Sequence, residues 1–108
     1  MAQTLSEVQF AKIDLAAATG TLVAAQAAGV KIRVVGLFLV NTTGQTLTFK
    51  SGAGGTALTG AMALAANGVL ALPFNPVGWF ETAAAALLEL ALSVGTQVSG
   101  AIAWVAVS

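Results

Sequence analysis

The chain has 108 residues, a length that suits one domain with a single core. Four basic and four acidic residues give a formal net charge of zero, and histidine, cysteine and tyrosine are absent. This inventory excludes imidazole and thiolate catalysis, disulfides and the usual zinc and iron ligand sets, and it offers no basic patch for nucleic acid. We therefore expect no catalytic residues, no metal or other cofactor, no small-molecule substrate and no nucleic-acid partner.

The balance of apolar and charged residues is unusual. Apolar residues make up 57% of the chain and charged residues 7%, against about 25% charged in an ordinary soluble domain. Because so few charges cover little of the outer surface, we expect contacts between copies of the chain to cover much of the rest. Lys31, Arg33 and Glu89 interrupt the apolar runs before the roughly 18 residues that a membrane-spanning helix needs, and the N-terminal segment lacks the apolar core of a signal peptide. We expect cytoplasmic synthesis and no membrane partner.

Turn-forming residues punctuate the chain at short intervals, and β-branched, aromatic and leucine residues fill the segments between them. This pattern is typical of short antiparallel strands. The eight predicted strands are VQFAKID (8–14), GTLVAAQ (20–26), VKIRVVGLFLVN (30–41), QTLTFK (45–50), GTALTGAM (55–62), GVLALPF (68–74), ALLELALSV (86–94) and VSGAIAWVAV (98–107). They predict an all-β fold over residues 1–108, a single antiparallel β-sandwich or jelly roll, with residues 1–20 as an extended arm or an edge strand.

The clearest predicted strand, residues 30–41, is apolar on both faces at its far end. By period two, one face holds Val30, Ile32, Val34, Phe38 and Val40, and the other holds Lys31, Arg33, Val35, Leu37 and Leu39. A strand that is apolar on both faces is covered twice, so we predict that Val35, Leu37 and Leu39 lie in an interface. Lys31 and Arg33, on the same face, either grip an acidic partner or keep the strand edge soluble.

The later strands show the same alternation. In residues 45–50, Leu47 and Phe49 are predicted to point inward, and the preceding NTTG indicates a hairpin turn. In residues 86–94 the apolar side is Leu88, Leu90, Leu92 and Val94, with Glu89 on the solvated outer side. Residues 83–92 also have good helix propensity, but the leucine period of two favours a strand. The VGTQ that follows is predicted to close a terminal hairpin with residues 98–107, where Ile102 and Trp104 share one side.

Three segments superficially resemble functional sites. SGAGGTALTG (51–60) lacks the Gly-Lys-Ser/Thr ending of a phosphate-binding loop and is interpreted as a turn. Asn41 begins an Asn-Thr-Thr glycosylation pattern, but without a secretory signal the turn interpretation is favoured. Glu81 and Glu89 are candidates for a glycosidase pair, yet nothing in the sequence places them together, and we expect both to be solvated or ion-paired.

The segment LPFNPVGWFETA (72–83) concentrates rigid and bulky residues. Its prolines fix φ and remove two backbone donors, so the segment is predicted to be a stiff, ordered loop and not a paired central strand. Trp79 and Phe80 are neighbours in an extended chain and should point to opposite sides, with Phe80 inward and Trp79 outward. The predicted interface residues of this loop are Pro73, Phe74, Asn75, Pro76, Trp79 and Phe80. With few amides and acids nearby, a protein partner fits the loop better than a saccharide.

Three stretches carry a resemblance to a known family: IRVVGLFLVNTTGQTLTFKSG, GAMALAANGVLALPFNPVGWFETA and LLELALSVGTQVSGAIAWVAV. Together they resemble small virion proteins of tailed bacteriophages and prophages, the head decoration or cement proteins, over about the last three quarters of the chain. PFNPVGWFET is the most recognisable piece. The resemblance implies a jelly-roll protein of the capsid surface, a homotrimer or less often a dimer, that binds the major capsid protein and bridges capsomers. It implies no catalytic residue.

The competing expectation is a glycan-binding or host-attachment jelly roll on a head fibre or tail. It predicts aromatic and amide side chains gathered at one loop end and measurable sugar binding.

Overall fold

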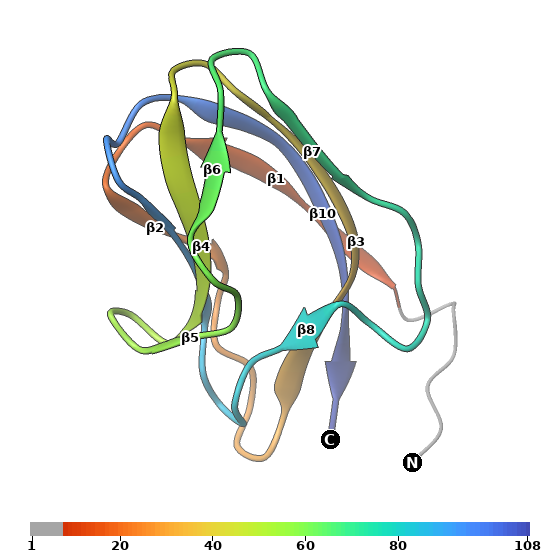
Figure 1. Ribbon diagram of the computed structural model, residues 1–108. Coiled ribbons are helices and arrows are strands. Elements are labelled where there is room, and N and C mark those ends of the chain that lie inside the picture. Colours follow the sequence, from red (N-terminus) through yellow and green to blue (C-terminus); the bar gives the residue numbers. More distant parts are fainter. Residues whose placement is uncertain (1–7) are drawn as a thin grey trace.

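The computed structural model describes residues 8–108 and folds them into two antiparallel sheets that pack face to face as a β-sandwich (Figure 1). The strands are β1 (Gln9–Leu15), β2 (Thr19–Val23), β3 (Lys31–Asn41), β4 (Gln45–Ser51), β5 (Thr56–Ala57), β6 (Met62–Leu64), β7 (Val69–Leu72), β8 (Phe80–Glu81), β9 (Leu88–Leu92) and β10 (Val98–Val107). Sheet A has the order β1-β10-β3-β7, with β8 also on β3. Sheet B has the order β2-β9-β4-β5, with β6 also on β4. The predicted all-β sandwich is confirmed, and β1 is an edge strand of sheet A.

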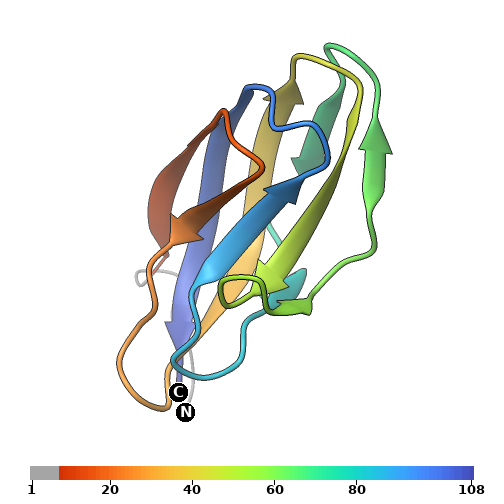
Figure 2. The same cartoon turned by 90° about the vertical axis from the view of Figure 1, so that its left-hand side faces the viewer.

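The two turns predicted to close hairpins cross from one sheet to the other. β3 lies in sheet A and β4 in sheet B, and β9 lies in sheet B and β10 in sheet A (Figure 2). The predicted hairpins at NTTG and VGTQ are therefore wrong, although both segments are turns. A tight turn can return a strand to its own sheet or pass it to the facing sheet, and alternation specifies only which side of a strand faces the core.

The described residues form ten strands where the sequence predicts eight. The predicted strand at 55–62 is divided into β5 and β6, which pair with opposite ends of β4. Between them the Thr59 hydroxyl accepts the amide hydrogen of Phe49 at 3.3 Å, which substitutes for a ladder bond between backbones. The additional strand, β8, forms because the chain after β7 returns to β3 and pairs Phe80 with Val34.

The core between the sheets contains most of the side chains that alternation assigned to it in β4, β9 and β10. Leu47, Phe49, Leu88 and Leu90 are fully buried, and Ile102 and Trp104 join them in the same cluster. The period-two leucines of residues 88–92 thus form a strand, as predicted. Val94 is 58% exposed, because the chain leaves β9 after Leu92 and turns toward sheet A.

A β-bulge in β3 reverses the predicted faces of its second half. Val34 pairs with Trp104 and Gly36 pairs with Ala103, so Val35 is an extra residue with no direct partner on β10. The extra residue shifts the alternation by one. The result is that Leu37 and Leu39 point into the core, whereas Phe38 and Val40, predicted to point inward, are 50% and 46% exposed.

Two buried amides hold the crossing turns together. Asn41 donates through Nδ2 to the carbonyl oxygens of Leu64 and Ala65, at 3.2 and 3.1 Å. Gln45 donates to Asn41 Oδ1 at 2.8 Å, and its own Oε1 accepts the amide hydrogen of Gly95 at 3.1 Å. Asn41 is fully buried, so the Asn-Thr-Thr pattern is a structural turn and not an accessible glycosylation site.

Candidate interaction surface

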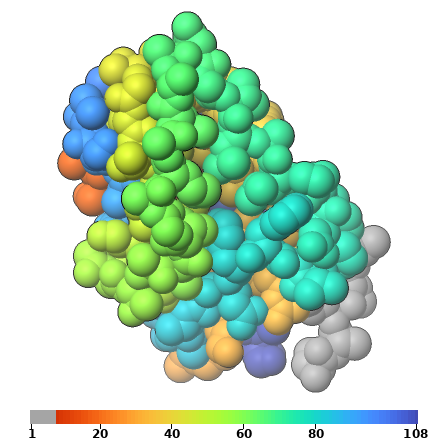
Figure 3. Space-filling view, in the orientation of Figure 1, coloured from red at the N-terminus to blue at the C-terminus, as the bar shows by residue number. Residues whose placement is uncertain are grey.

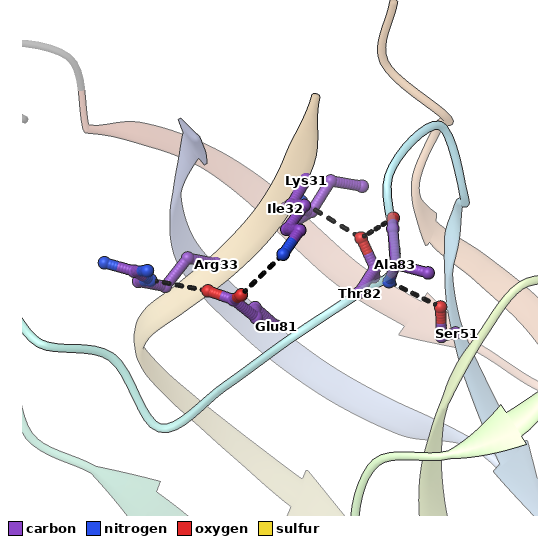
Figure 4. A network of polar contacts seen from close by, with 7 residues as sticks. All are labelled: Lys31, Ile32, Arg33, Ser51, Glu81, Thr82 and Ala83. Carbon is purple, nitrogen blue, oxygen red and sulfur yellow. Dashed lines mark hydrogen bonds and ion pairs between the residues drawn. The ribbon is translucent and has the colours of Figure 1, made fainter. Parts of the chain in front are cut away.

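Lys31 and Arg33, for which the sequence left open an acidic partner or a role in keeping the strand edge soluble, lie against an acid of the same chain (Figure 4). Arg33 pairs with Glu81 across the β3–β8 ladder, and its Nε donates to Glu81 Oε1 at 2.8 Å. Lys31 Nζ lies 3.5 Å from Glu81 Oε2. The Arg33 hydrogen bond, with smaller help from the charges of Arg33 and Lys31, lowers the pKa of Glu81 below its ordinary value of 4.5 against the opposing effect of burial.

Hydroxyl groups beside this ion cluster join the two sheets. Thr82 is buried and its Oγ1 accepts the amide hydrogen of Ile32 at 3.0 Å. The amide of Ala83 donates to Ser51 Oγ, on sheet B, at 2.8 Å. Figure 4 shows these hydrogen bonds beside the ion pairs of Glu81. Together they hold the chain that follows β8 against β3 of sheet A and β4 of sheet B.

Residues 73–79, here called the strap, connect β7 to β8 along the edge of β3 that both strands pair with, and lie along the right-hand side of the molecule in Figure 3. The amides of Asn75 and Trp79 donate to the carbonyl oxygens of Val35 and Val34, each at 2.8 Å, so the strap is tied to β3 at the bulge. Gly78 has φ of 96°, and a Cβ there would lie 2.5 Å from Arg33 Cγ. The strap is the ordered loop that its sequence predicts, and β3 determines its position.

The two adjacent aromatics at the end of the strap differ in burial. Phe80 packs against the core, with its ring centroid 5.0 Å from that of Phe49. Trp79 is 42% exposed, and its Nε1 donates to the carbonyl oxygen of Pro73 at 2.9 Å. Phe80 is thus the inward residue, as predicted. Trp79 does not point fully to the opposite side, since it lines a hollow with Phe80 and Met62.

The outer side of sheet A carries the largest exposed aromatic groups of the described residues. We define the phenylalanine face as Phe10, Phe38, Val40, Val69 and Phe74. Its three phenylalanines are 78%, 50% and 52% exposed in chain order, which leaves roughly 270 to 450 Å² of aromatic surface in water at about 150 to 250 Å² per side chain. The largest apolar patch on a monomeric protein is commonly of about this size and is often functional, so the phenylalanine face is the candidate interaction site.

The register of sheet A explains how this face forms. Phe10 on β1 pairs with Ala103, and Ala101, the next outward residue on β10, pairs with Phe38. Small side chains on β10 thus separate the two phenylalanines and leave a hollow of about 500 Å³ between them. Phe74 borders the same hollow, and its Cα would be 3.6 Å from a Cβ on Gly36, so glycine brings the chain close to β3. Every residue that lines the hollow is apolar or glycine: Val8, Phe10, Gly36, Leu37, Phe38, Leu72, Phe74, Ala101, Ile102 and Ala103.

The predicted interface residues are only partly brought together. Leu37 and Leu39 point into the core, which contradicts the prediction that their side chains lie in an interface, although Leu37 also borders the hollow of the phenylalanine face. Val35 is also buried, with 1% exposure, at the bulge beneath the bonds to the strap, so it offers no free surface. Phe74 belongs to the phenylalanine face, while Pro73, Asn75, Pro76 and Trp79 remain on the strap beside it.

Phe10 and Phe38 were missed as interface residues. The outward direction of Phe10 was predictable, because by period two Phe10 shares a side of its strand with the charged Lys12 and Asp14 and lies opposite Ala11 and Ile13. Phe38 carried no such signal, since its outward direction depends on the bulge.

The remaining candidate sites have structural roles. Glu89 is 5% exposed, and its Oε1 accepts the amide hydrogen of Gly54 at 3.1 Å in the 52–55 turn. The prediction that Glu89 is solvated is wrong, because the turn covers it. The glycine-rich segment thus binds a carboxylate of its own chain through the Gly54 amide. Glu89 lies on β9 of sheet B and Glu81 lies on β8 of sheet A, so the two acids belong to different sheets. Residues 8–108 contain no group of three or more histidine, cysteine, aspartate and glutamate side chains arranged to hold a metal ion.

Comparison with protein-family models, with curated proteins and with solved structures finds no match to this chain. Among residues 8–108 there is no helix long and apolar enough to span a membrane.

Proposed function

We propose that this protein is a non-catalytic structural protein of a phage virion, a capsid decoration or cement protein that acts by protein–protein contact on the outside of the head. The observation that carries the proposal is the phenylalanine face, an exposed aromatic surface on an otherwise closed sandwich. The proposal takes the virion setting from the resemblance of the sequence to head decoration proteins.

The strand order supports the jelly-roll assignment that belongs to this proposal. The first and last strands, β1 and β10, pair in sheet A, and the next pair inward, β2 and β9, lies in sheet B. β3 and β4 follow in the same manner, on β10 and on β9. This nesting of strands across two sheets is expected when a long hairpin is rolled up on itself, which is how a jelly roll arises.

The chemistry of the face favours a protein partner over a glycan. A sugar site needs polar side chains beside its aromatic platform, and the hollow between Phe10, Phe38 and Phe74 is lined by none. Two polar side-chain atoms of the strap already have partners, since Asn75 Oδ1 accepts the amide hydrogen of Val77 and the indole of Trp79 donates to the carbonyl oxygen of Pro73.

The mechanism we propose is mechanical. Copies of the protein associate with one another and with the major capsid protein, burying apolar area across capsomer boundaries and opposing the outward pressure of packaged DNA. The low charge of the chain suits close packing between subunits, because few ions lose their hydration when the subunits meet.

Immunogold electron microscopy of particles purified from the encoding organism tests the proposal, with antibody against the folded protein. Label on the outer surface of heads is expected. Label confined to tails or fibres, together with binding of the purified protein on a glycan array, would replace the cement function by host attachment. Particles without the protein would remove the virion proposal altogether.

A further inference from the structure

The phenylalanine face has the properties of a self-complementary surface. We infer that its occupant is a second copy of this chain, packed face to face about a two-fold axis that passes close to Phe38. The inference rests on the proposed function in one respect, that the protein works as a homo-oligomer, and it assigns that contact to one face with one symmetry.

The exposed area matches what such a pair needs. A stable interface buries about 800 Å² per partner, of which roughly 56 to 65% is apolar. The phenylalanines supply roughly 270 to 450 Å² of aromatic area, and Val40 and Val69, 46% and 61% exposed, extend it along β3 and β7. The face also carries both the projecting side chain of Phe10 and a hollow of about 500 Å³. One surface thus provides most of the apolar part of a standard interface, and it provides projections as well as a recess.

The charges at the border of the face complement themselves. Lys12 and Asp14 are exposed on the same outer side of β1 as Phe10. The hydrogen bond that Asp14 accepts at 2.7 Å comes from the side-chain amide of Gln97, which is a neutral group. In a two-fold contact each residue meets a residue of the partner reciprocally. Lys12 lies in the same cross-strand row as Phe38, and Asp14 lies in the next row. An axis that crosses the strands beside Phe38, between these two rows, brings Lys12 of each copy toward Asp14 of the other at the β1 edge of the interface. With a formal net charge of zero, the two copies do not repel each other.

The distribution of exposed apolar groups favours a two-fold pair over a three-fold ring. A ring joins two different surfaces of each subunit, whereas a two-fold contact uses one surface twice. Among residues 8–108, the large apolar side chains that are exposed outside the phenylalanine face are Val77 and Trp79 on the strap and Val94 on the β9–β10 turn. The outer side of sheet B offers threonines at 19, 21, 46 and 48. The structure therefore favours a dimer over the trimer that the family resemblance implies.

A matched pair of valine substitutions tests the inference. Val69 on the face and Val94 away from it are 61% and 58% exposed, so each tolerates a charged group in the monomer. Sedimentation equilibrium of the full chain should give a dimer mass. Val69→Asp should raise the dimer dissociation constant at least tenfold, and Val94→Asp should leave it within about threefold. Circular dichroism confirms that both variants fold.

The absence of cysteine from the chain allows a symmetry test by cross-linking. Under mild oxidation Phe38→Cys should form disulfide-linked dimers, because each copy presents the same residue near the axis, and Val94→Cys should remain monomeric on a denaturing gel. Equal cross-linking of the two variants would overturn the inference.

The outcomes separate this inference from the proposed function. A monomer at 100 μM, or a trimer whose mass is unaffected by Val69→Asp, overturns the inference and leaves the face to another protein such as the capsid subunit. A dimer that dissociates with Val69→Asp supports the inference, and it does so whether or not the protein is found on phage heads.

Discussion

The outer sides of the two sheets differ in a way that their inner sides do not. Inward, both sheets contribute fully buried aliphatic and aromatic side chains to one core. Outward, sheet B is a mixture of threonine, alanine and Lys50, whereas sheet A presents Phe10, Phe38 and Val69. An antiparallel sheet normally has one side against the core and one side in water. Sheet B follows that rule, and sheet A departs from it by exposing large apolar side chains, which is the observation on which the proposed interface rests.

The loops beside the two outer sides also differ in polarity. On sheet B the glycine turn at residues 52–55 approaches closely and donates an amide hydrogen to Glu89. On sheet A the strap is tied by its backbone to β3, while Phe74 and Val77 remain 52% and 78% exposed. The 52–55 turn thus adds polar groups to the outer side of sheet B, whereas the strap adds the exposed ring of Phe74 to the apolar outer side of sheet A.

The largest change in stability is expected from truncating Leu39, which points into the core, and the comparison is with its neighbour Phe38, which points outward from sheet A. Leu39→Ala should lower the free energy of unfolding by about 2 to 5 kcal/mol, because Leu39 is fully buried and its truncation leaves a cavity. Phe38→Ala should cost less than about 1 kcal/mol in the monomer, because the ring is half exposed. Urea denaturation at a concentration low enough to keep the chain monomeric measures both. The reverse order of effects would mean that the bulge at Val35 does not shift the alternation.

A smaller loss of stability is expected when the hydrogen bond between Glu89 and the 52–55 turn of sheet B is removed. Glu89→Ala leaves the Gly54 amide without its carboxylate acceptor and should cost about 1 to 3 kcal/mol of unfolding free energy. Glu89→Gln keeps an oxygen acceptor and should retain most of the stability. If the two variants unfold at the same urea concentration, the hydrogen bond to the turn contributes little.

A smaller loss of stability is expected when the hydrogen bond between the Trp79 indole and the Pro73 carbonyl is removed from the strap. Trp79→Phe preserves an aromatic ring but removes the donor to the Pro73 carbonyl, with an expected cost of about 0.5 to 1.5 kcal/mol. Val77→Ala is the control, because Val77 is 78% exposed and should change stability by less than about 0.5 kcal/mol. Thermal unfolding followed by near-ultraviolet circular dichroism also reports whether the indole environment loosens.

The smallest effect concerns the ion cluster at the border of sheet A. Because its partners lower the pKa of Glu81 in the folded state, the carboxylate stabilises the protein above about pH 4.5. That contribution is lost as the pH falls below 4.5 through the lowered folded-state pKa. Glu81 is one third exposed, so the contribution should be below about 1 kcal/mol. Wild type should lose more stability than Glu81→Gln between pH 5 and pH 3, and equal slopes would show that the cluster contributes nothing measurable.

Much of the fold follows from local pattern. The alternating leucines of residues 88–92 and the inward positions of Leu47 and Phe49 were predictable, because one buried side of a strand imposes a period of two on the sequence. The loop course of the strap outside the paired strands was predictable from Pro73 and Pro76, which lack the backbone donor that a strand needs. The near absence of titratable groups in the sequence limited the chemistry that any arrangement of this chain offers.

The tertiary structure decided which sheet each strand joins and which side of sheet A meets water. NTTG and VGTQ have turn chemistry that serves a hairpin or a sheet crossing equally, so only the closing of the sandwich distinguishes them. Phe38 faces outward because Val35 is inserted opposite β10, and that insertion depends on a register between strands far apart in the chain. Phe10, Phe38 and Phe74 form one surface because β1 and β3 lie on either side of β10 and the strap folds back over Gly36, contacts between distant residues that no local pattern records.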